Sequence, residues 1–176
     1  CLRGRRRAVI TISTDAQAIA PWMAERLQRP VAEGQLIAAV SDGVVLSAAW
    51  FEVIFGSTVV AHLATGTVFL PREFLWYIFH YPFRELQAER ILAPVASSNH
   101  PAQRIVTHLG FVLEATLSPQ ESPVWLYTMT EAQCRWLSLK EPQNGKCRKH
   151  SHRNALRDTE RAENSRLRGS GTGDGG

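Results

Sequence analysis

The fold of this chain is decided by residues 89–111, which read ERILAPVASSNHPAQRIVTHLGF. Residues 91–96 are a short apolar segment, which predicts a buried strand. Asn99 precedes residues 102–109, whose apolar side chains have the spacing of a helix. Gly110 follows directly, and glycine commonly ends a helix. The stretch therefore predicts a strand, a helix and the start of a further strand in direct succession.

The residues before this stretch predict two helices and three strands. Residues 16–27 carry an apolar stripe at helical spacing, and Asp15 is placed to cap that helix. Two β-branched segments flank an Asp-Gly pair, which is a strong signal for a hairpin. A third strand follows, and then a helical pattern that begins at Pro71 and that Pro82 should kink. The three strands are expected at residues 35–40, 44–53 and 58–63.

The residues after the stretch predict two more strands and one turn of helix. Residues 111–117 and 124–129 alternate between apolar and polar side chains, which is typical of strands with one buried face. Residues 130–137 could add a last helical turn. The order of elements indicates a mixed α/β fold with at least one β-α-β unit, centred on residues 58–95.

Charge divides the sequence into three segments, although the net charge is +4. Residues 1–7 contain four arginines, and residues 138–176 contain nine Lys and Arg against five Asp and Glu. Residues 8–137 hold seven basic and eleven acidic side chains, a net charge of −4. We therefore expect one folded domain at 8–137 between a basic N-terminal extension and a disordered polar tail. The basic ends would bind polyanions weakly, whereas the domain suits a cationic amine better than a nucleic-acid groove.

Composition disfavours membrane, secreted and metal-binding proteins. No apolar segment approaches the ~18 residues of a membrane-spanning helix, and the basic start is not followed by the apolar core of a signal peptide. Cys1, Cys134 and Cys147 are scattered, and no Cys or His cluster has zinc spacing. We therefore expect reduced thiols, no metal site, no membrane partner and a cytoplasmic location.

Residues 89–129 resemble the second half of the GNAT (acyl-CoA N-acyltransferase) fold. In this family a central strand ends near an asparagine, a helix follows, and a Gly-Phe pair begins the next strand, as Asn99 and Gly110-Phe111 do here. The order of the elements upstream also agrees, so the resemblance covers roughly residues 8–130. The segment His80-Tyr81-Pro82-Phe83 is similar to a variant helix of phage-encoded members. The resemblance rests further on residues 89–95, Ala102, Leu109 and Glu114.

The resemblance implies a mixed, mostly antiparallel sheet with a central pair of parallel strands that splay apart, and helices on both faces. The pantetheine arm of acetyl-CoA would lie in the slot between the two strands, here residues 58–65 and 91–96. Arg72 would face the pyrophosphate at the start of a helix, where unpaired amides favour an anion. The residues that would hold the pantetheine and thioester are Ala93, Val95, Ser97 and Asn99.

The implied activity is transfer of an acetyl group from acetyl-CoA to an amine by direct attack. An ammonium is not a nucleophile, so a base must remove its proton. Glu52 and His62 lie on the strands beside the expected acceptor site and are the candidates, although either could instead face solvent. The acceptor is expected to be an amine of a small molecule or of a protein, and the chain could form a homodimer.

Two positions depart from the family pattern. Residues 67–72, the equivalent of the pyrophosphate loop, have no glycine at the expected places. Val106 stands where many members have a tyrosine that protonates the departing thiolate. These departures favour an alternative hypothesis, in which the fold serves as a binding or structural module without catalysis. Such a module could belong to a phage particle or act on a host protein, in the virion or the host cytoplasm.

Overall fold

The computed structural model describes residues 9–118 and 123–142, except the side chains of residues 53–55. All of them belong to the first of two units, Cys1–Lys146. The predicted basic extension at residues 1–7 lies outside the described residues, and so do residues 143–176 of the tail predicted at 138–176.

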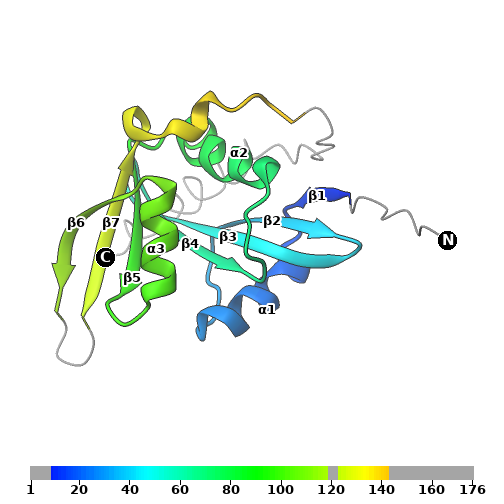
Figure 1. Ribbon diagram of the computed structural model, residues 1–176, viewed down its shortest axis with the longest axis horizontal. Helices are drawn as coiled ribbons and strands as arrows, with labels where there is room; N and C mark the ends of the chain where they lie inside the picture. The colour runs from blue at the N-terminus through cyan, green and yellow to red at the C-terminus, as the bar shows by residue number, and fades with distance from the viewer. Residues whose placement is uncertain (1–8, 119–122, 143–176) are drawn as a thin grey trace, which may run out of the picture. The chain divides into compact units, whose positions relative to one another are not determined.

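The described residues form a seven-stranded sheet in the order β1-β2-β3-β4-β5-β7-β6 (Figure 1). Neighbouring strands are antiparallel except β4 and β5, which pair in parallel. This arrangement confirms the mixed sheet with a central parallel pair. The strands are β1 (Ile10–Ser13), β2 (Gln35–Ser41), β3 (Val44–Phe55), β4 (Thr58–Thr65), β5 (Arg90–Ala96), β6 (Val112–Leu117) and β7 (Val124–Thr130).

The predicted hairpin between β2 and β3 is confirmed. It turns at Asp42 and Gly43, whose φ angles are both positive, at +50° and +78°. A hairpin turn with two positive φ angles is the type that Asp-Gly favours, because its twist matches that of the strands.

β1 is a strand that the sequence did not predict. It pairs with β2 at the edge of the sheet, with Ile10 opposite Ser41. The strand has four residues. Only Ile10 and Ile12 show the alternation of apolar and polar side chains, so the pattern was too short to predict a strand.

Helix α1 (Ala16–Leu27) covers one face of the sheet (Figure 1). Asp15 caps it as predicted, because its side chain accepts a hydrogen bond from the Gln17 amide at 3.1 Å. Ile19 and Met23 are fully buried. They pack in a core cluster with side chains from β2, β3 and β4, which include Leu36, Ala38, Ala48, Trp50 and Ala64.

Helices α2 (Arg72–His80) and α3 (His100–Leu109) cover the opposite face. After α2 the chain continues as a π-helical turn (Tyr81–Glu85) that contains Pro82, which is the irregularity expected from a proline inside a helical pattern. Gly110 ends α3 with a φ of +103°, a conformation that favours glycine. Helices therefore lie on both faces of the sheet, as expected.

The C-terminal part of the described chain forms two short 3₁₀ segments, Glu131–Gln133 and Arg135–Ser138. They replace the single helical turn that the sequence predicted. Trp136 anchors the second segment, since its Nε1 donates to the Leu109 carbonyl at 2.7 Å and its ring stacks on Phe79. None of the described helices is both long enough and apolar enough to cross a membrane.

Candidate active site

The parallel strands β4 and β5 separate part-way along their length. They pair at three positions, of which the last is Val60 with Leu92. In the described part of the chain, β4 then continues to Thr65 and β5 to Ala96 without further pairing between them. The facing strand edges therefore present backbone N–H and C=O groups that a ligand can satisfy. This is the splayed slot that the resemblance implied.

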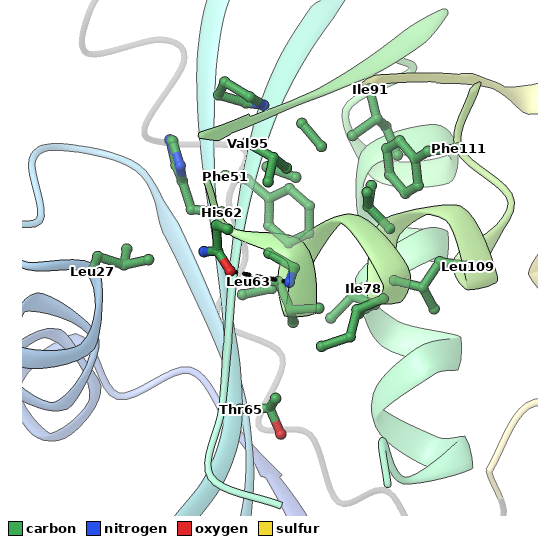
Figure 2. Close-up of a pocket in the computed structure, with 18 of the residues that line it drawn as sticks. Leu27, Phe51, His62, Leu63, Thr65, Ile78, Ile91, Val95, Leu109 and Phe111 are labelled. Atoms are coloured by element: carbon green, nitrogen blue, oxygen red, sulfur yellow. Dashed lines mark hydrogen bonds between the residues drawn. The ribbon is translucent and has the colours of Figure 1, made fainter. Parts of the chain in front are cut away.

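A cavity of about 180 Å³ lies at the splay. Its wall is formed by both strands, by Ala49 and Phe51 of β3, by α2 and α3 with Phe111 after α3, and by Leu27 at the end of α1. Most of the lining side chains are apolar, and the polar ones are His62, Thr65 and Asn99. Figure 2 shows Leu27 and His62 on one side of β4 and Leu109 on the other. The cavity therefore has walls on both faces of the sheet.

Glu52 and His62, which are separate candidates in the sequence, form a hydrogen-bonded pair. His62 Nε2 lies 2.7 Å from Glu52 Oε2 across strands β4 and β3. Because a carboxylate only accepts hydrogen bonds, Nε2 of the neutral ring carries the hydrogen, and Nδ1 keeps a free lone pair. Burial lowers the pKa of His62 below 6.5, and the hydrogen bond to Glu52 opposes this shift. The lowered pKa favours the neutral form of the ring.

Arg29 completes this cluster, and the sequence analysis missed it. Its Nη2 lies 3.7 Å from Glu52 Oε1, and its guanidinium carbon lies 4.9 Å from the centroid of the Trp50 ring. That ring is fully buried and lies 4.8 Å from the His62 ring. The Glu52 carboxylate thus contacts the Arg29 guanidinium through Oε1 and the His62 imidazole through Oε2. Arg29 lies in a loop, so neither helical nor strand periodicity pointed to it.

Three of the four residues expected to hold pantetheine line the cavity. Ala93 and Val95 belong to β5 and are each 9% exposed, and Asn99 follows the strand. Asn99 also caps α3, because its Oδ1 accepts a hydrogen bond from the Ala102 amide at 3.2 Å. The side chain of Asn99 therefore has a structural role that fixes the start of the helix beside the slot.

Ser97, the fourth of these residues, is not part of the cavity wall. Its backbone N–H donates to the Pro123 carbonyl, and its own carbonyl accepts from Gln103 Nε2 at 2.8 Å. Gln103 also donates to the Ala96 carbonyl at 3.1 Å. Gln103 is buried, and it ties the end of β5 to α3. The sequence analysis missed this residue, since glutamine on a helix carries no signal of its own.

Arg72 is the first residue of α2 and is exposed. It forms no hydrogen bond or ion pair with any residue that the structure describes. Pro71 precedes it and gives the helix no side-chain cap, so the first amides of α2 are free and favour an anion. In the loop before the helix, Val68 and Phe69 are 92% and 82% exposed.

No model of a protein family and no curated protein matches this sequence. Solved structures match its fold. A variant of the spermidine N-acetyltransferase SpeG from Vibrio cholerae matches with a TM-score of 0.56 at 11% identity, over 73% of this chain and 96% of that chain. The chain has the GNAT fold.

Two further structures share the GNAT fold with this chain. The aminoglycoside acetyltransferase AAC(6')-Ib, in complex with coenzyme A and kanamycin, has a TM-score of 0.54 at 14% identity, over 71% of this chain and 96% of that chain. The protein yncA from Salmonella typhimurium, with its cofactor acetyl-CoA, has a TM-score of 0.51 at 14% identity. The match covers 69% of this chain and 93% of that chain. Identities this low establish a shared fold and not a shared substrate.

Val106 of α3 lines the cavity and is buried. It occupies the position at which the GNAT resemblance expects a proton-donating tyrosine, and an isopropyl group cannot donate a proton. Among the described residues, no group of three or more His, Cys, Asp or Glu side chains could hold a metal ion.

Proposed function

We propose that this protein is an N-acetyltransferase that moves an acetyl group from acetyl-CoA to an amine by direct attack. The observation that carries the proposal is the Glu52–His62 pair, which places a base at the wall of the cavity between two splayed strands. The GNAT fold supports the proposal, because AAC(6')-Ib and yncA share it and were solved with coenzyme A and acetyl-CoA.

The residues around the slot fit an acyl-CoA donor. Acetyl-CoA, when bound, supplies an acetyl group activated as a thioester, so that attack by an amine forms a C–N bond and breaks the C–S bond. The apolar wall, which includes Ala93 and Val95, suits the pantetheine arm. The unpaired edges of β4 and β5 offer hydrogen bonds to its amides. Arg72 and the free amides of α2 offer positive charge to the pyrophosphate.

His62 acts as the base, and Glu52 orients it. Neutral His62 takes the proton of the attacking amine at Nδ1, while its Nε2–H remains bonded to the Glu52 carboxylate, which stabilises the imidazolium that forms. Because burial lowers the pKa of His62, the ring is ready to accept a proton at neutral pH. Val106 offers no proton, so the departing sulfur takes up the proton that His62 accepted or one from solvent.

Direct attack is favoured over a covalent acyl-enzyme. Cys134 is buried and does not line the cavity, and burial raises the pKa of its thiol. A thiol in such surroundings is a poor nucleophile, because the thiolate is the reactive form. Thr65 does line the cavity, but its hydroxyl is within hydrogen-bond distance of Ser47 and Thr67 and has no base beside it.

The second candidate function is a binding or structural module that has kept the fold without catalysis. The observation that favours it is the loop before α2, which has no glycine at the expected places of residues 67–72 and in which Val68 and Phe69 face outward. Glycine lets backbone amides approach phosphate groups closely, and these side chains do not. Such a module would hold a protein partner in fixed stoichiometry and would not bind acetyl-CoA.

Calorimetric titration of the full chain with acetyl-CoA separates the two candidates. The N-acetyltransferase proposal expects saturable binding, and no binding at millimolar ligand would overturn it. Arg72→Ala should weaken binding about ten-fold, because a charge-assisted contact to phosphate is lost. The matched control is Arg90→Ala. Arg90 begins β5 at the closed end of the slot, about 20 Å along the strand from Ala96, and this change should leave the affinity unaltered.

Thiol release from acetyl-CoA in the presence of a panel of amines tests the base. His62→Gln should lower the rate about 10²- to 10⁴-fold, the usual contribution of a general base. His108→Gln is the control, since His108 is exposed on α3 and does not line the cavity. Equal rates in the two variants would remove His62 from the mechanism.

A further inference from the structure

The inner end of the cavity lies in the hydrophobic core. Its side chains contain only carbon and hydrogen, and all are buried in the core cluster between the sheet and helices α2 and α3. Figure 2 shows Ile78, Ile91, Leu109 and Phe111 together on the side of β4 away from His62. We define the inner compartment as Phe51, Ile78, Phe79, Ile91, Leu109 and Phe111.

The inner compartment reaches past the point at which the two strands separate. Ile91 is paired with Val59, so at this level β4 and β5 are still joined, and the cavity lies over the sheet beneath α2 and α3. His62 comes three residues after Val59, about 10 Å along an extended strand. The methyl of an acetyl group is one bond from the carbonyl carbon that an amine at His62 attacks. An acetyl group therefore leaves this compartment unfilled.

The whole cavity is large compared with the voids of a closely packed core. Protein interiors are packed closely, with few voids larger than a water molecule. The compartment has no polar side chain to hold water, and an apolar cavity of ~150 Å³ stays dry and binds a molecule of the size of benzene. The whole cavity, of which the inner compartment is one end and the slot between β4 and β5 another part, measures about 180 Å³.

We propose that the inner compartment is an acyl-chain pocket, and that the donors of this protein include CoA thioesters of short apolar acyl chains, such as butyryl, which bind more tightly than acetyl-CoA. This inference rests on the proposed function and extends its donor class. A longer acyl chain does not change which bonds form and break. The C–N bond forms, the C–S bond breaks, the amine loses a proton and the sulfur gains one.

The two faces of the sheet make this arrangement possible. The amine meets His62 on the face that α1 covers, where Leu27 also lines the cavity. The acyl chain lies on the other face, beneath α2 and α3. A longer acyl chain therefore does not occupy the space through which the amine arrives.

Calorimetric titration of the full chain with CoA, acetyl-CoA and butyryl-CoA tests the pocket by binding alone. Each buried methylene should strengthen binding about four-fold, so butyryl-CoA should bind about fifteen-fold more tightly than acetyl-CoA. Equal or weaker binding of butyryl-CoA, with CoA and acetyl-CoA still bound, would overturn the pocket and leave the proposed function standing. A failure of all three to bind would overturn the proposed function and the pocket with it.

Two variants change the pocket in opposite directions. Val106→Phe places a larger side chain on the cavity wall and should abolish the preference for butyryl-CoA. Val112→Phe is the matched control on the exposed edge strand β6, and it should keep that preference. Where Val106→Phe fails to fold, Phe111→Leu enlarges the compartment and should shift the preference towards hexanoyl-CoA. An unchanged order of affinities in the variant that folds would overturn the assignment.

Discussion

Replacing Gly34 by alanine should destabilise the protein more than an ordinary glycine replacement. Gly34 has a φ of +154°, and an ideal Cβ at this residue would overlap the Phe51 carbonyl oxygen and lie 2.5 Å from Trp50 Nε1. The carbonyl belongs to the middle of β3, where Phe51 pairs with Gln35, and Trp50 is fully buried. Neither neighbour can move without disturbing the sheet or the core. Overpacking of this kind costs about 1–3 kcal/mol, in addition to about 1 kcal/mol for the backbone conformation.

Gly43→Ala is the matched control. Gly43 also has a positive φ, of +78°, but a Cβ there would meet nothing within 4 Å, so only the backbone cost of about 1 kcal/mol remains. In urea unfolding followed by circular dichroism, a difference of about 2 kcal/mol corresponds to a midpoint lower by about 1 M for Gly34→Ala. If the two variants unfold within about 0.2 M of each other, the steric reasoning is wrong. Because the Trp50 ring packs against His62 and beneath Arg29, Gly34→Ala should also disturb the candidate site.

Three further outcomes are expected. Glu52→Gln should lower the pKa of His62 further, since the Glu52 hydrogen bond and charge both raise it, and the acid limb of the pH–rate profile should move to lower pH; an unmoved limb would argue against the pair. The pKa of His62 is lowered in the folded state, so its contribution to stability is present above pH 6.5 and is lost as the pH falls below that value. His62→Gln should therefore weaken the acid dependence of unfolding in urea, compared at pH values above and below 6.5. Trp136→Phe keeps the stacking on Phe79 but removes the hydrogen bond to the Leu109 carbonyl; it should cost about 1 kcal/mol by the same assay, and no change in midpoint would discount that bond.

Local signals in the sequence were enough for most of the fold. The Asp42-Gly43 turn, the Asp15 cap and the Gly110 stop each depend on a few neighbouring residues, and each lies where it was expected. Hydrophobic periodicity placed the longer helices and strands for the same reason. β1 was missed because a four-residue edge strand is held by its pairing with β2 rather than by its own pattern.

The candidate site depended more on contacts that no local pattern contains. Glu52 and His62 could be named as candidates from their strands, but their hydrogen bond depends on the register between β3 and β4. Arg29 and Gln103 reach their partners from a loop and from a helix face. Side chains of this kind are placed by the tertiary fold, so single-sequence reasoning has no means to bring them together.

The splay of β4 and β5 explains why a base and an apolar pocket can share one cavity. Side chains alternate between the two faces of a strand, so Ala61, His62 and Leu63 cannot all point to one side of a closed sheet. All three nevertheless line the cavity, because β4 has lost its partner beyond Val60 and the opening extends through the sheet at that point. The polar pair on one face and the apolar compartment on the other therefore come together only at this break in pairing. A change that restored pairing between β4 and β5 would separate the base from the acyl group even if every side chain remained in place.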